Sequence, residues 1–139
     1  MDINTLLKAL DNEENAKFIN VNTQKINDMK KQVMEELELP VKQTKEILAK
    51  LKYYMYIDEM NDLRCGAFLR WIPITDPENI YLMPGGILCD IQITQEGIVL
   101  ICKNFAHKHY QFKMDECLIF QKLTNQEQVL LSALDYLEK

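Results

Sequence analysis

Both histidines of this chain and three of its sixteen basic residues lie in one short segment, KNFAHKHYQFK, at residues 103–113. Three aromatic residues are interleaved with them, and the segment contains no acidic residue. Such a mixture could bind nucleic acid, because lysine neutralises phosphate and an aromatic ring stacks on a base. It could also hold a metal ion, since His107 and His109 point to the same side of an extended segment. The third interpretation is the solvated face of a β-hairpin.

The nucleic-acid hypothesis uses a basic strip beside one exposed aromatic ring. The lysines and histidines would face outward, while Tyr110 and Phe112 face inward. Residues 97–114 contain three lysines and no acid, but the chain as a whole carries a net charge of −5, which argues against a general polyanion binder. Trp71 would extend the strip if its strand exposes it. The residues assigned to this site are Lys103, Phe105, His107, Lys108, His109, Lys113 and Arg70.

A metal site or a catalytic site needs more groups than the local sequence supplies. The histidines would need further ligands, for which Asp115 and Cys117 are the candidates, and an enzymatic interpretation would require all four in one cleft. The chain has no CxxC pair, GxSxG, phosphate-binding glycine loop or HExxH motif. The adjacent acids in the pairs Asp58-Glu59 and Asp115-Glu116 point in diverging directions. We therefore predict no catalytic residue, no metal and no cofactor, and a protein that is not an enzyme.

The composition indicates one globular domain. The chain has 139 residues, of which 47% are hydrophobic and 27% charged, and no apolar run approaches the roughly 20 residues of a membrane span. The segment MDINTLLKALDNEEN has neither the basic region nor the apolar core of a signal peptide. We expect an intracellular protein, in the cytoplasm, the nucleus or a virion interior, that is not secreted and does not bind membranes. Its cysteines are then reduced core or near-core residues, at positions Cys65, Cys89, Cys102 and Cys117.

Glycine placement separates predicted helices from predicted strands. All four glycines lie between Gly66 and Gly97, and apolar residues recur at three- and four-residue spacing on both sides. The N-terminal part predicts a short helix around Leu6, Leu7 and Leu10, a second over residues 25–39 and a third over residues 41–55. The C-terminal part predicts a helix that begins with a capping box in TNQE, residues 124–127. Its apolar stripe either seals one end of a barrel or docks on the N-terminal helices.

The middle of the chain predicts five short strands. They cover residues 66–74, 87–93, 98–103, 110–114 and 118–122, and the second and third form a hairpin. In the second strand, strict alternation places four residues on one face: Ile87, Cys89, Ile91 and Ile93.

The layout of residues 62–122 resembles the small barrels of the SH3/Tudor-like class. The one-turn break in FKM-DEC-LIF is similar to the turn before the last strand of such barrels, and DLRCGAFLRWI is similar to the entry into the first. The OB barrel is the competing five-stranded fold. The resemblance implies binding of peptides, modified tails or nucleic acid. The segments LRCGAFLRWIPI and DECLIFQKLTNQEQVLLSALDYL also resemble proteins of large DNA viruses, a resemblance that implies no activity and no site residues.

These observations predict an α+β fold with N-terminal helices, a five-stranded SH3-like antiparallel barrel and a C-terminal helix. The expected division is a helical layer over residues 1–60, a barrel over 61–122 and a capping helix over 123–139, all in one cooperative unit. We expect a non-catalytic interaction or assembly module whose partner is another protein or a second copy of this chain. The alternative is a nucleic-acid-binding accessory protein that uses residues 103–113.

Overall fold

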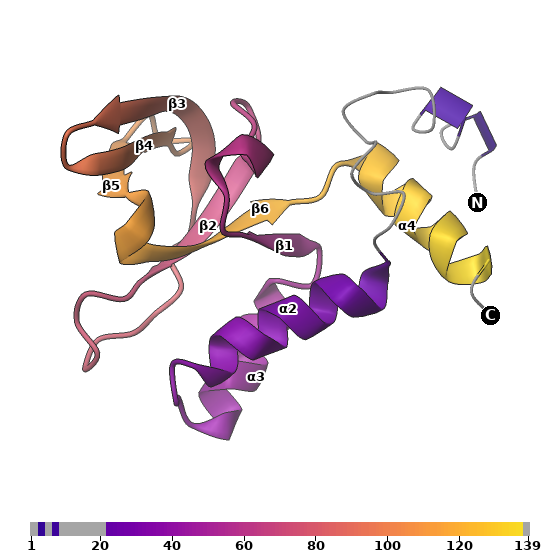
Figure 1. Cartoon of the computed structure of the whole chain (residues 1–139), viewed down its shortest axis with the longest axis horizontal. Coiled ribbons are helices and arrows are strands. Elements are labelled where there is room, and N and C mark those ends of the chain that lie inside the picture. Colours follow the sequence, from indigo (N-terminus) through magenta and orange to yellow (C-terminus); the bar gives the residue numbers. More distant parts are fainter. Residues whose placement is uncertain (1–2, 5–6, 9–21, 138–139) are drawn as a thin grey trace.

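The computed structural model describes residues 3–4, 7–8 and 22–137, and it has an α+β fold. Helices α2 (Thr23–Glu35) and α3 (Val41–Lys50) lie against one side of an antiparallel sheet, and α4 (Asn125–Leu137) lies beyond its end (Figure 1). None of the helices in the described residues is long and apolar enough to cross a membrane. The strands are β1 (Tyr54–Ile57), β2 (Phe68–Pro73), β3 (Gly86–Thr94), β4 (Gly97–Lys103), β5 (His109–Lys113) and β6 (Cys117–Lys122), with one-turn 3₁₀ helices η2 (Met60–Asp62) and η3 (Met114–Glu116).

The sheet is open and strongly curled. Its six strands follow the order β1-β6-β2-β3-β4-β5, so β1 and β5 form its two edges. Strands β2 and β5 are separated by two others, which in a flat sheet would place them about 14 Å apart. The ring of Trp71 on β2 nevertheless stacks on that of Phe112 on β5, with 4.3 Å between centroids. The sheet therefore folds over its own inner face, but the predicted closed barrel of five strands is not confirmed, since there are six strands and two open edges.

Strand β1, which the sequence does not predict, begins within the segment predicted as the third helix. The third helix ends at Lys50 instead of continuing to residue 55, and β1 begins at Tyr54. Aromatic residues at 53, 54 and 56 favour a strand, and each residue of β1 pairs with one of β6. The second helix begins at Thr23 because the side chain of Asn22 accepts a hydrogen bond from the Lys25 amide at 2.8 Å. In the predicted first helix, Leu6 and Leu10 lie outside the described residues.

Each face of the sheet packs into its own hydrophobic core. The inner face closes around Leu69, Trp71 and Leu100, with Tyr110 and Phe112 packed against them as predicted. The outer face of β1, β2 and β6 packs on α2 and α3, where Phe120 is fully buried. Alternate residues of β2 and β6 therefore enter opposite cores, which fixes the register of these two strands.

A bulge in β3 reverses the face predicted for its first half. Leu88 pairs with Cys102 and Asp90 pairs with Ile101, so Cys89 has no partner. As a result Leu88 is 1% exposed and points into the inner core, whereas Ile87 and Cys89 point outward. The predicted apolar face of this strand is thus wrong at Ile87 and Cys89, whereas Ile91 packs against the inner core, and Cys89 is exposed instead of lying in or near the core.

The capping box at the start of α4 is confirmed. The Glu127 amide donates to the Thr124 hydroxyl at 3.1 Å, and the Glu127 carboxylate accepts from the Thr124 amide at 2.8 Å. Leu130 and Leu131 of α4 pack with Ile26 of α2. Of the two predicted positions for this helix, the structure has the one on the N-terminal helices.

Candidate nucleic-acid interface

A rigid turn between β4 and β5 presents Phe105. The side-chain oxygen of Asn104 accepts hydrogen bonds from the amides of Ala106 and Lys108, both at 2.9 Å. The Asn104 carbonyl accepts from the His107 amide at 3.0 Å, and His107 takes the left-handed conformation with φ of 63°. Asparagine suits this role because its short side chain bonds to the backbone of the following residues. Phe105 lies within this turn and is 82% exposed.

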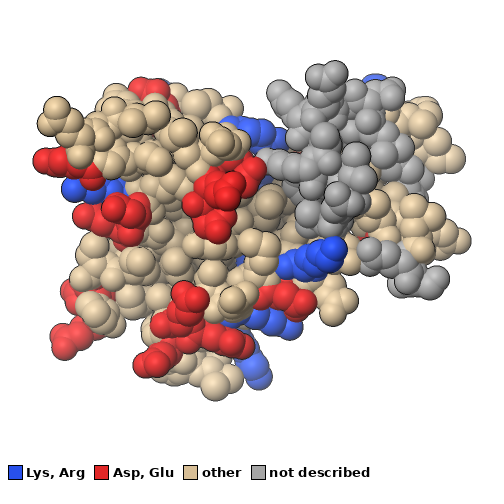
Figure 2. Space-filling model, viewed as in Figure 1, with Lys and Arg blue, Asp and Glu red and all other residues tan. Residues whose placement is uncertain are grey.

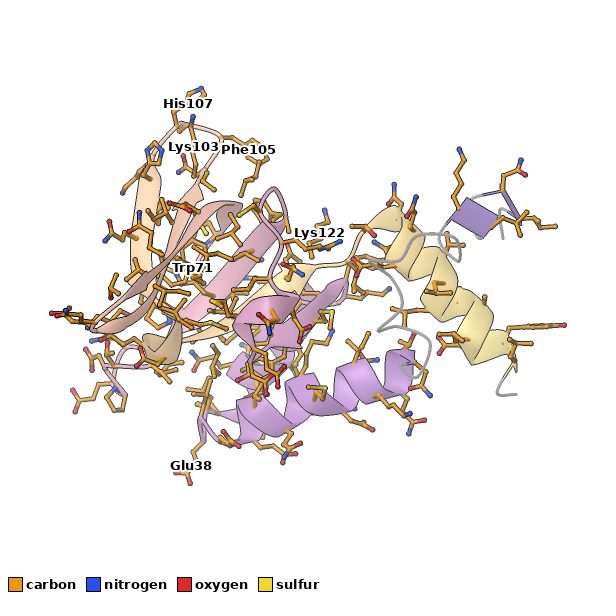
Figure 3. All side chains as sticks on the ribbon, turned by 45° about the horizontal axis from the view of Figure 1, so that its top comes forward. Glu38, Trp71, Lys103, Phe105, His107 and Lys122 are labelled. Atoms are coloured by element: carbon orange, nitrogen blue, oxygen red, sulfur yellow. The ribbon has the colours of Figure 1, made fainter. Side chains whose placement is uncertain are left out.

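Phe105 forms an aromatic pair with Phe68 on β2. Their rings are stacked, with centroids 6.1 Å apart and an angle of 15° between planes. Gly85 makes room for this arrangement, because a Cβ at that position would lie 2.8 Å from the Phe68 ring. Figure 3 shows Phe105 beside Lys103 and His107 at one end of the molecule, with Glu38 at the opposite end.

The register of the sheet adds a row of residues to the aromatic pair. Phe68 lies opposite Ile87, Ile87 opposite Lys103, and Lys103 opposite His109, so one row crosses β2, β3, β4 and β5. Residues directly opposite each other share a face. Their chain neighbours Leu69, Leu88, Cys102 and Tyr110 pack into the inner core, so this row faces outward.

A pocket of about 440 Å³ lies beside Phe68. Exposed Lys122 and the Arg64–Phe68 segment line it. Two cations line the pocket, Arg64 and Lys122. The guanidinium of Arg64 pairs with the buried carboxylate of Glu127 at 2.9 Å. The cross-strand row, the aromatic pair and the lysine of the pocket wall lie at the same end of the sheet. We call these six residues the aromatic–basic band: Phe68, Ile87, Lys103, Phe105, His109 and Lys122.

Three of the predicted site residues belong to this band: Lys103, Phe105 and His109. His107 is exposed in the same turn. The ammonium of Lys108 lies over the Tyr110 ring, 5.2 Å from its centroid. These five residues lie in the turn between β4 and β5 or in the strand residues next to it.

The remaining predicted residues lie elsewhere or have other partners. Lys113 is at the far end of β5 and pairs with Glu96 at 3.6 Å. Arg70 is half-buried and donates from Nε to the Met83 carbonyl at 2.9 Å. Trp71 is 2% exposed, so the proposal that it extends the strip is wrong. The sequence does not point to Phe68 and Lys122 as site residues. Alternation along β2 and β6 shows which residues share a face within each strand, but the pairing of the strands is needed to place these two residues in the site.

No family model, curated protein or solved structure matches this chain.

The candidate metal ligands are not gathered in one place. His107 lies in the turn before β5 and His109 at its start, whereas Asp115 and Cys117 follow its end, about 15 Å further along an extended strand. No group of three or more His, Cys, Asp or Glu that could hold a metal ion occurs within the described parts of the chain. The cleft that an enzymatic interpretation would require is not formed by these four residues.

Acidic side chains gather away from the band. Figure 2 shows separate acidic clusters over the sheet and around the end of the molecule formed by α2 and α3. Exposed Glu35 ends α2, exposed Glu36 and Glu38 follow it before α3 begins, and Figure 3 places Glu38 far from Lys103. The net charge of −5 is therefore unevenly distributed, and it does not exclude an anionic ligand at the band.

The four cysteines should fall into two classes of reactivity. Burial raises the pKa of Cys102 and of Cys117 to about 12, whereas Cys65 and Cys89 are exposed. Because the thiolate is the reactive form, we expect two thiols of the native protein to react quickly with a disulfide reagent at mildly alkaline pH. Half-buried Cys117 should react much more slowly, and Cys102, which is 0% exposed, should react only on unfolding. Absorbance titration with and without denaturant tests this, and four equally fast thiols would contradict the burial of Cys102 and Cys117.

Proposed function

We propose that this chain is a non-catalytic binding module whose aromatic–basic band contacts single-stranded nucleic acid. The observation that carries the proposal is the exposed Phe105 ring, which is stacked on Phe68 and lies beside Lys103 (Figure 3). Aromatic stacking contributes about 1–3 kcal/mol per base, and lysine side chains contact the phosphates that connect the bases. The pocket between Phe68 and Lys122 offers a second position where a base can leave the solvent.

The shape of the band favours a single strand over a duplex. Phe105 presents the face of a ring, and base faces are accessible only where the bases are not stacked inside a double helix. The non-catalytic part of the proposal is supported by the separation of the candidate catalytic groups, since the two histidines and residues 115–117 lie at opposite ends of β5. The buried thiols add to this. Burial holds the pKa of Cys102 and Cys117 near 12, so these thiols stay protonated and are poor nucleophiles.

We further propose that β2 to β6 form an SH3-like unit with β1 added at one edge. Support comes from the strand order β6-β2-β3-β4-β5 and from the one-turn η3 between β5 and β6, which together match the layout expected for that class. Closure of the barrel stays a proposal, and the curl shown by the contact between Trp71 and Phe112 supports it.

The direct test is fluorescence anisotropy with short labelled DNA and RNA, single- and double-stranded, at low and physiological salt. We expect single strands to bind, and the Phe105→Ala variant to bind about tenfold more weakly through the loss of stacking. The double variant Lys103→Glu, Lys122→Glu should bind more weakly still and lose part of the salt dependence. Phe105 is mostly exposed, so its replacement should leave the melting temperature nearly unchanged.

A matched control separates the band from overall charge. Lys42→Glu, Lys45→Glu changes two exposed lysines of α3 and produces the same net charge. This variant should bind like the original chain. Equal weakening by both double variants, or no binding at low salt, would overturn the proposal. Bound single strands should also slow the reaction of Cys65, which lines the pocket beside Phe68.

A protein-binding role is the second candidate function. The sequence analysis gives this role as its main expectation. A surface other than the band supports it, namely a mainly apolar pocket with a carboxylate rim at the other end of the sheet.

A further inference from the structure

A second pocket of about 440 Å³ lies at the end of the sheet opposite the aromatic–basic band. Strand β6 connects the two sites, because Leu118 lines this pocket and Lys122 lines the other. Four residues of extended chain separate them by about 13 Å. In Figure 1, β6 runs from the orange turn of η3 at the left to the segment that leads into α4 at the right. The two pockets therefore open at different ends of the molecule.

The second pocket combines an apolar wall with a negative rim. Ile74, Ile98 and Met114 are half-buried and contribute apolar surface. Asp58 and Asp115 are exposed and also line it. Among the described residues that line this pocket there is no lysine or arginine. A nucleic-acid phosphate would meet only like charge here, so the ligand of this pocket differs from the ligand of the band.

Charges next to the pocket strengthen its negative character. Tyr56 lines it, and burial, then Asp58 and Glu36, raise the pKa of its hydroxyl. Glu116 is exposed in η3, next to Asp115. The nearby cation Lys113 is already paired with Glu96 at 3.6 Å. The field at the rim thus attracts a positive group.

We propose that this pocket binds a protein segment in which a lysine or arginine lies next to an apolar residue. Long basic side chains have an aliphatic stem and a charged end. The stem would cover Ile74 and Ile98, and the charged end would meet the carboxylates of Asp58 and Asp115. This proposal is independent of nucleic-acid binding, because it uses a different pocket and a ligand of the opposite charge. One molecule could hold both ligands at the same time.

Selection from a display library of random peptides against the immobilised full chain tests this proposal. We expect enrichment of peptides with lysine or arginine beside leucine, isoleucine, methionine or phenylalanine. Synthetic versions of the enriched peptides should bind about tenfold more weakly to Asp58→Asn, Asp115→Asn, which keeps side-chain size but removes both charges. Replacing the basic residue of the peptide by glutamate should abolish binding.

The control variant is Glu35→Gln, Glu46→Gln, which removes two exposed charges from α2 and α3 and changes the net charge equally. It should bind the peptides like the original chain. Melting temperatures and oligonucleotide binding of both variants show whether the fold and the band are intact. The proposal is overturned if no basic peptides are enriched, or if the enriched peptides bind equally to both double variants. Those outcomes leave the test of the band unaffected.

Discussion

Trp71→Ala is expected to lower the free energy of unfolding by about 3–5 kcal/mol, the largest loss that we predict for a single substitution. Trp71 is 2% exposed, its ring stacks on Phe112 at 4.3 Å, and its edge meets Tyr110 at 5.7 Å between centroids. These contacts join β2 to β5 across the inner face. Alanine would leave a large cavity and remove the contacts that hold the curl. Urea denaturation followed by circular dichroism measures the loss.

The control for this prediction is an aromatic residue outside the core. Tyr81 is 54% exposed, so Tyr81→Ala should change stability by less than about 0.5 kcal/mol. A loss below about 1 kcal/mol for Trp71→Ala would be too small for a filled core position. It would show that β2 and β5 do not pack against each other as described.

Gly85→Ala is expected to cost about 2–5 kcal/mol, from two causes that act together. Gly85 has a φ of +105°, where an L side chain is strained. A Cβ there would also clash with the Leu69 carbonyl oxygen, which belongs to the paired strands and cannot easily move. The substitution should also displace the Phe68 ring and weaken oligonucleotide binding.

Gly66 offers a matched comparison. Its φ is +92°, but nothing lies within 4 Å of the position that a Cβ would take. Gly66→Ala should therefore show only the cost of the left-handed backbone, about 1–2 kcal/mol. The difference between the two variants, measured by thermal and urea unfolding, isolates the clash at Gly85. Equal losses would mean that the backbone around Leu69 can move aside.

Local patterns in the sequence predict the helices and most strands well. The capping box of Thr124 and Glu127 depends on residues three apart, and it forms as expected. The inward positions of Cys102, Tyr110 and Phe112 follow from simple alternation. Strand β1 was missed because the apolar spacing of α3 continues into Tyr54, and only its pairing with β6 makes it a strand.

The candidate site was only partly predictable for the same physical reason. Lys103, Phe105 and His109 are close in the sequence and visible as a segment. Phe68 and Lys122 join them through the register of the sheet, which depends on the bulge at Cys89 and on the sheet order. No local pattern announces a bulge of this kind, because the alternation of residues 87–93 is regular without it. The burial of Trp71 could not be predicted either, because it depends on which face of the sheet curls inward.

The position of β6 has a consequence for how the chain acquires its structure during synthesis. Among the strands of the described residues, β1 pairs with β6 alone, although about sixty residues separate them along the chain. A ribosome releases β1 long before β6, so β1 has no strand partner while β2 to β5 emerge. Distant pairings of this kind slow folding and leave strand edges open to other chains. Synthesis of β6 therefore completes the sheet, and until β6 emerges the edges of β1 stay exposed to other chains.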